Sequence, residues 1–77
     1  MPIEETHVLA IMRTESRPIK ARRIAWILRT ETGENVSRQD VNRLLYAMKH
    51  RGIVTVDQDY FWTLLGEARY GVNDPDR

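Results

Sequence analysis

The sequence predicts a small α+β domain in which three amphipathic helices precede a β-hairpin. Apolar residues recur at helical spacing in three segments before His50. After Gly52 two runs of β-branched and aromatic residues flank a short polar segment, as in a hairpin. The length of 77 residues fits one domain. We therefore expect a single domain over residues 1–77, with its core at about 4–65 and a tail at 66–77.

The first helix is expected over residues 4–14. Glu4 and Glu5 suit the positive N-terminal end of a helix dipole. Pro18 pushes the preceding residue out of the helical conformation, so the helix ends before it and Ile19 falls in a short extended segment. The apolar residues at helical spacing are Val8, Leu9 and Met12.

The second helix is expected over residues 21–32. Gly33 follows it and is a suitable C-terminal stop, because glycine adopts the left-handed conformation that ends many helices. The predicted buried stripe consists of Ile24, Ile27 and Leu28.

The third helix has the clearest start. Ser37 and Asp40 form an S-x-x-D pattern that resembles a capping box, so the helix is expected over residues 38–50, with Ser37 as its N-cap. Gly52 closes it. One apolar face follows from the spacing i, i+3, i+4, i+7 of Val41, Leu44, Leu45 and Met48.

Two strands, at residues 53–56 and 60–64, are expected around a turn at 57–59. A two-stranded hairpin is not stable alone in water, so it must pack on the helices, and Ile19 could supply a third strand. This arrangement is a winged helix-turn-helix, with three helices and a β wing of two to three strands. A three-helix bundle with a disordered tail is the alternative. A further helical turn is expected at 65–70.

Charge is distributed unevenly along the chain. Residues 13–51 hold ten Lys or Arg and four acids, a net charge of +6, whereas the remainder holds two Arg and seven acids, a net of −5. Such a separation suggests an anionic partner for the middle of the chain. Solvated helix faces would give the same pattern.

Composition argues against several classes of protein. The chain has no cysteine, and His7 and His50 lie in different predicted helices without clustered acids, so we expect no metal site and no other cofactor. No nucleophile, glycine-rich phosphate loop or Ser-His-Asp arrangement is visible, so we expect no enzyme. No signal peptide or membrane span is apparent. We expect a cytoplasmic protein, with nucleoid or nucleus also open.

The exposed face of the third helix is the candidate binding surface. Arg38, Asn42 and Tyr46 are spaced i, i+4, i+8 and form one row. Cations suit phosphate oxygens, and amides and phenols can donate to phosphate or read a base edge. A polar helix face with no ligand is the alternative interpretation. Flanking this row are Gln39, Arg43, Lys49 and His50.

Trp62 is expected beside this row. Tyr60, Trp62 and Leu64 alternate and so share one face of their strand. Leu64 should point to the core and Trp62 toward Tyr46. Trp62 is then either an ordinary core residue or, packed with Tyr46, part of the ligand surface.

These residues resemble the Z-alpha domains, winged helices that bind left-handed Z-form DNA and RNA. The resemblance spans about residues 4–64, but its specific identities are the run RQDVNRLLY from Arg38 to Tyr46, then Lys49, Gly52 and Trp62. The family has a basic residue, an acid, Asn-Arg, a Leu-Tyr pair and a tryptophan in the last wing strand.

The resemblance implies a role for each matching residue. Asn42 would bind a phosphate directly, and Arg38 and Arg43 would contact further phosphates. Tyr46 would lie against a syn guanine, with Trp62 supporting it. The wing departs from the family, because residues 55–61 lack its pair of prolines and carry two acids.

The expected partner is therefore duplex nucleic acid, DNA ahead of RNA, either in the Z form or as an ordinary duplex with the third helix in the major groove. Transcription regulation is the expected setting. The alternative function is a winged-helix module for protein interaction or homodimerisation, centred on Trp26, which lies roughly opposite Ile24 on its helix. Trp26 is expected either to pack under the tail near Tyr70 or to form an exposed contact.

Overall fold

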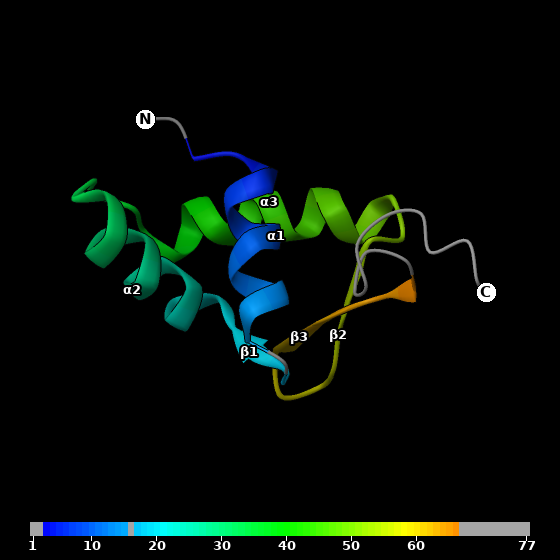
Figure 1. Cartoon of the computed structure of the whole chain (residues 1–77). Coiled ribbons are helices and arrows are strands. Elements are labelled where there is room, and N and C mark those ends of the chain that lie inside the picture. Colours follow the sequence, from blue (N-terminus) through cyan, green and yellow to red (C-terminus); the bar gives the residue numbers. More distant parts are fainter. Residues whose placement is uncertain (1–2, 16, 67–77) are drawn as a thin grey trace, which may run out of the picture.

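The computed structural model describes residues 3–15 and 17–66. Within these ranges, three helices and three strands follow one another in the predicted order (Figure 1). The α+β class is confirmed. The helical turn expected at 65–70 lies largely outside the described residues.

No helix in the described ranges is both long and apolar enough to cross a membrane. The elements are α1 (Glu5–Thr14), β1 (Ile19–Lys20), α2 (Ala21–Thr32), α3 (Arg38–His50), β2 (Val54–Val56) and β3 (Phe61–Leu64).

Local signals set the ends of α1 and α2. At the start of α1 the Glu4 backbone N–H donates to Nδ1 of His7 over 2.9 Å, which completes a capping box. Gly33 ends α2 in the left-handed conformation, with φ 74°, and its N–H donates to the Arg29 carbonyl. The predicted stop at Gly33 is confirmed.

The connection from α3 to β2 is a Schellman turn. Gly52 has φ 77°, its N–H donates to the Lys49 carbonyl over 3.0 Å, and the Ile53 N–H donates to the Met48 carbonyl over 3.0 Å. Ile53 itself packs against the core. Helix α3 therefore ends in a fixed geometry that directs the chain into β2.

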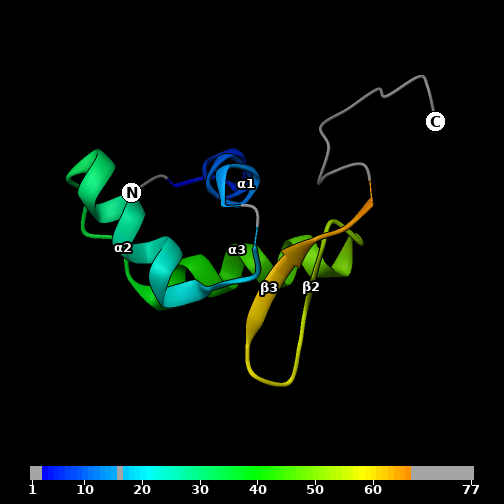
Figure 2. The same ribbon diagram turned by 60° about the horizontal axis from the view of Figure 1, so that its bottom comes forward.

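The three described strands form one antiparallel sheet in the order β1-β3-β2, so β3 is central, and Figure 2 shows it beside β2 in the hairpin. Ile19 lies opposite Trp62 in the β1–β3 pair, and Val56 lies opposite Trp62 in the β2–β3 pair. The prediction that Ile19 adds a third strand to the hairpin is confirmed. The arrangement is compatible with a winged-helix layout.

The core lies between the three helices and the sheet, and each helix contacts the other two. Trp62 is its largest fully buried side chain. Three predicted core residues, Leu9, Ile27 and Leu44, are only partly buried and pack at its margin. The buried residues are Val8, Ile11, Met12, Ile19, Ala21, Ile24, Ala25, Leu28, Val36, Val41, Leu45, Met48, Val54, Trp62 and Leu64.

Tyr60 departs from the predicted alternation. Trp62 and Leu64 are buried on one face of β3, but Tyr60 is 67% exposed and precedes the strand. Its φ of 67° is the reason, because this left-handed conformation belongs to the hairpin turn and not to extended backbone. The strand therefore begins at Phe61 and not at residue 60.

Candidate nucleic-acid interface

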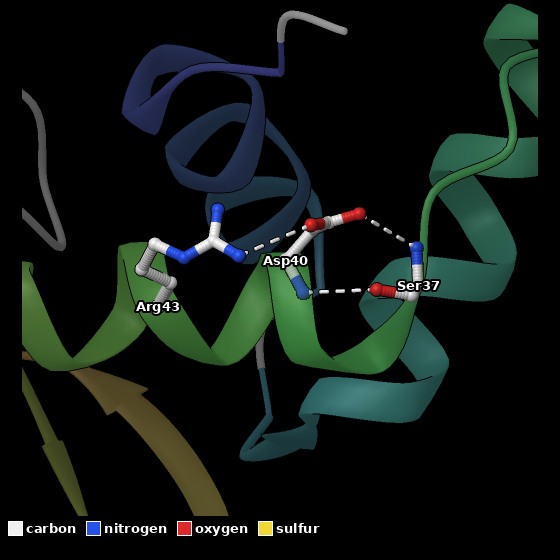
Figure 3. Close-up of polar contacts among 3 residues, drawn as sticks. All are labelled: Ser37, Asp40 and Arg43. Carbon is white, nitrogen blue, oxygen red and sulfur yellow. Dashed lines mark hydrogen bonds and ion pairs between the residues drawn. The ribbon is translucent and has the colours of Figure 1, made fainter.

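The site is built on α3, which begins with a complete capping box (Figure 3). The Asp40 N–H donates to Oγ of Ser37, and the Ser37 N–H donates to Oδ2 of Asp40, each over 3.1 Å. The hydrogen bond from the Ser37 backbone is the main reason that the pKa of Asp40 lies below its ordinary value, and the Ser37 hydroxyl and Arg43 also lower it. The predicted N-cap is confirmed.

The predicted row of α3 lines one groove with Trp62. Arg38, Asn42 and Tyr46 come from α3, and Trp62 comes from β3. The groove has a volume of about 390 Å³. We call it the α3 groove, and its lining residues are Lys20, Ala21, Arg22, Arg38, Asn42, Tyr46, Tyr60 and Trp62.

Tyr46 rests on Trp62 inside this groove. The two ring centroids are 5.1 Å apart and the ring planes meet at 88°, an edge-to-face arrangement. Tyr46 is 46% exposed, whereas Trp62 is 1% exposed. Trp62 is therefore a core residue, as the first interpretation has it, and it also packs against the half-exposed tyrosine.

Three further polar residues line the α3 groove without having been named as site residues from the sequence. Lys20 and Arg22 lie at the β1–α2 junction, and Tyr60 lies in the hairpin turn. The signal for Lys20 and Arg22 in the sequence was only the high charge of residues 13–51, and Tyr60 was expected only to share a strand face with Trp62. Their position depends on the pairing of β1 with β3, which places the start of α2 beside the hairpin.

The remaining predicted site residues lie on α3 but outside the lining of this groove. Gln39 and Lys49 are exposed. The Arg43 side chain is 77% exposed, and its Nη2 lies 3.5 Å from Oδ1 of Asp40, back toward the helix start (Figure 3). These three side chains extend the polar face of α3 beyond the groove. The residues of α3 that line the groove are Arg38, Asn42 and Tyr46.

The tip of the hairpin is organised by Asp57. Its Oδ1 accepts hydrogen bonds from the Asp59 N–H at 2.9 Å and the Phe61 N–H at 3.0 Å. The Tyr60 N–H donates to the Asp57 carbonyl at 3.0 Å. Asp57 therefore shapes the turn, as carboxylates in such turns commonly do. Neither Asp57 nor Asp59 lines the α3 groove.

Trp26 lies on α2, apart from the α3 groove. It is 51% exposed, and the Arg23 guanidinium carbon lies 5.1 Å from its ring centroid. This exposure fits the second interpretation, a surface contact. Tyr70, the predicted alternative neighbour, lies outside the described residues.

The lining of the α3 groove has a consistent chemistry. Lys20, Arg22 and Arg38 supply cations, Asn42 supplies an amide, and Tyr46 and Tyr60 supply phenols, with no carboxylate among the lining residues. Every one of these groups can donate a hydrogen bond to an anion.

Across residues 3–15 and 17–66, no cluster of His, Cys, Asp or Glu is arranged to hold a metal ion. Comparisons of the chain with protein-family models, curated proteins and solved structures found no match.

Proposed function

We propose that this domain is a winged helix-turn-helix that binds the phosphate backbone of duplex nucleic acid through the α3 groove. The observation that carries the proposal is the meeting of Arg38, Asn42 and Tyr46 with two further cations in a groove without carboxylates. The order of elements, with α2 and α3 followed by a hairpin, supports the winged-helix part.

The groove favours backbone contacts over base reading. Guanidinium and ammonium groups bind phosphate oxygens, and their affinity does not depend on sequence. Asn42 is half-buried and lines the groove together with the exposed Tyr46 ring. One amide and two phenols then supply directional donors between the cations.

Selectivity for the Z form is the finer part of the proposal. It is supported by the resemblance of residues 38–46 to Z-alpha domains and by the packing of Tyr46 on Trp62. A tyrosine that packs on a buried tryptophan and is half exposed suits contact with a base that projects from the helix surface. The wing contributes less in this chain than in that family, because Asp57 and Asp59 would repel phosphates near the tip.

Titration of a fluorescein-labelled duplex, followed by anisotropy, tests backbone binding. With about four phosphate contacts, the affinity should fall roughly a hundredfold between ~50 and ~200 mM salt, because each contact releases counterions. Asn42→Ala and Arg38→Gln should each weaken binding about tenfold. Thr55→Ala, an exposed change on β2, is the control and should leave the affinity unchanged. If no duplex binds at low salt, the proposal is wrong.

Circular dichroism of an alternating CG duplex tests the Z-form part. Addition of the protein should invert the long-wavelength bands, and Tyr46→Ala should abolish the inversion. Tyr46→Phe keeps the ring on Trp62 but removes the hydroxyl, so it separates the ring contact from the phenol's hydrogen bond. Binding without inversion would leave an ordinary duplex binder.

The second candidate function is a module for protein interaction or homodimerisation. The exposed ring of Trp26 is the observation that favours it. This function predicts binding that is insensitive to salt and lost in Trp26→Ala. Sedimentation of the chain alone measures the homodimer, and a monomer at all concentrations would exclude it.

A further inference from the structure

A second groove lies on the other side of the β1–α2 junction. It has a volume of about 920 Å³ and is open to solvent, and its walls come from β1, α2 and the hairpin. We call it the α2 groove. Arg17, Arg23 and Trp26 line it but not the α3 groove, whereas Lys20 and Arg22 lie between the two grooves and line both.

Positive charge dominates the lining of the α2 groove. Glu15 and Asp57 are the carboxylates among its lining residues. The Asp57 carboxylate already accepts two backbone N–H groups of the hairpin turn, so its position is fixed by the turn. The cations outnumber these two acids, and they are Arg17, Lys20, Arg22, Arg23 and Arg29.

Two exposed aromatic rings stand among these cations. Trp26 is 51% exposed and Phe61 is 37% exposed. Each ring carries a cation on one side: the Arg23 guanidinium carbon is 5.1 Å from the Trp26 centroid, and Nζ of Lys20 is 5.0 Å from the Phe61 centroid. A flat ring with a cation nearby offers a stacking surface for a base next to a partner for a phosphate.

We propose that the α2 groove binds an unpaired nucleic-acid strand, with bases stacked on Trp26 and Phe61 and phosphates paired with Arg17 and Arg23. Proteins that bind single strands combine a basic groove with exposed aromatic rings in this way. A duplex would leave the rings unused, because its base faces are stacked on one another. A purely apolar partner would leave the guanidinium groups near Trp26 without anions.

This site is separate from the proposed α3 function. Trp26, Phe61, Arg17 and Arg23 do not line the α3 groove. Loss of duplex binding in Asn42→Ala therefore does not test the α2 groove, and single-strand binding can fail while duplex binding remains. Each groove has its own variants and its own probe.

The experiment titrates the full chain with oligodeoxythymidylate of about 12 nucleotides and follows tryptophan fluorescence. The chain has two tryptophans, and Trp62 is 1% exposed, so quenching by a stacked base reports on Trp26. The expected result is saturable quenching that weakens with salt. Fluorescein-labelled oligonucleotide and anisotropy then give affinities for variants that lack the fluorophore.

Matched variants separate stacking from folding. Trp26→Ala should weaken binding about tenfold or more, whereas Trp26→Phe retains a ring and should keep most of the affinity. Both change one exposed side chain, and thermal melting checks that the fold is intact. Phe61→Leu should weaken binding by a smaller factor, because the less exposed ring offers less surface.

Charge variants identify the groove. The pair Arg17→Gln with Arg23→Gln should weaken single-strand binding and reduce the log–log salt slope by about 1.4, since each single-strand contact contributes about 0.7. The pair Arg43→Gln with Lys49→Gln removes equal charge from α3 and should leave this affinity within about twofold.

Four outcomes would overturn the inference. Binding that survives in Trp26→Ala places the strand elsewhere. An equal loss of single-strand affinity in the two double charge variants would show that binding depends on net charge and not on the α2 groove. Occupation of the groove by an oligoglutamate peptide with the affinity of the oligonucleotide, or burial of Trp26 in a homodimer, assigns the surface to a protein partner.

Discussion

The rings of Tyr46 and Trp62 meet at 88° with their centroids 5.1 Å apart, although one side chain is half exposed and the other is 1% exposed. The contact joins the core to the surface of the α3 groove. A change in the packing of β3 therefore reaches the lining of the α3 groove directly. It also means that stability and binding must be measured separately for variants at these two positions.

A double-mutant cycle should measure this contact. Trp62→Leu removes the largest buried side chain and should cost roughly 2–4 kcal/mol of unfolding free energy. Tyr46→Ala should cost less, because its ring is half exposed. The coupling energy between the two changes should be about 1 kcal/mol, the usual value for an edge-to-face pair. Urea denaturation of the wild type, the two single variants and the double variant gives this coupling energy. A coupling energy near zero would show that the ring contact contributes no stability beyond the burial of each side chain.

The capping box of α3 should make stability depend on pH. The folded pKa of Asp40 is lowered, chiefly by the Ser37 N–H, so the carboxylate stabilises the fold above about pH 4 and loses this effect as pH falls through its folded pKa. Asp40→Asn should be less stable than the wild type at neutral pH, and the difference should vanish in acid. Ser37→Ala should cost about 1 kcal/mol at neutral pH. Denaturation of all three proteins across pH checks this, and a constant difference would contradict it.

Replacement of Gly52 by alanine should destabilise the Schellman turn after α3. Gly52 has φ 77°, and no atom lies within 4 Å of where its Cβ would stand. The cost of Gly52→Ala is therefore one of backbone conformation, about 1 kcal/mol. Asn visits the left-handed region more readily, so Gly52→Asn should cost less. Thermal melting ranks the three proteins, and equal melting points would contradict this account.

Asp57 and Asp59 should differ although they lie in the same turn. Oδ1 of Asp57 accepts two backbone hydrogen bonds, so Asp57→Ala should cost about 1–2 kcal/mol. Among the described contacts, the Asp59 side chain accepts none, so Asp59→Ala should be nearly neutral. Both changes remove one negative charge. Urea denaturation distinguishes them, and an equal loss of stability in the two variants would contradict this account.

The helices could be predicted from the sequence because their signals are local. The Ser37–Asp40 pattern gave the start of α3, and Gly33 gave the end of α2. Both predicted spans, 21–32 and 38–50, match the structure. The row of Arg38, Asn42 and Tyr46 followed in turn, since the buried face of a helix determines the exposed one.

The rest of the candidate site depends on contacts between distant parts of the chain. Lys20 and Arg22 reach the α3 groove only because β1 pairs with β3, and no local pattern encodes that register. Tyr60 was expected in a strand, but its positive φ places it in the turn. For Trp26, the sequence left open an exposed contact or packing under the tail, and the cations around it in the α2 groove were not foreseen. Only the packing of the hairpin brings Phe61 to the same groove.

The central place of β3 also governs when the domain can form during synthesis. Until residues 61–64 have left the ribosome, neither β1 nor β2 has its hydrogen-bonding partner, and the helices lack the side chain of Trp62. The nascent chain therefore presents three amphipathic helices with an open apolar surface until β3 has been synthesised. A stop codon before Phe61 should yield a chain that aggregates or is degraded, even though it contains all three helices.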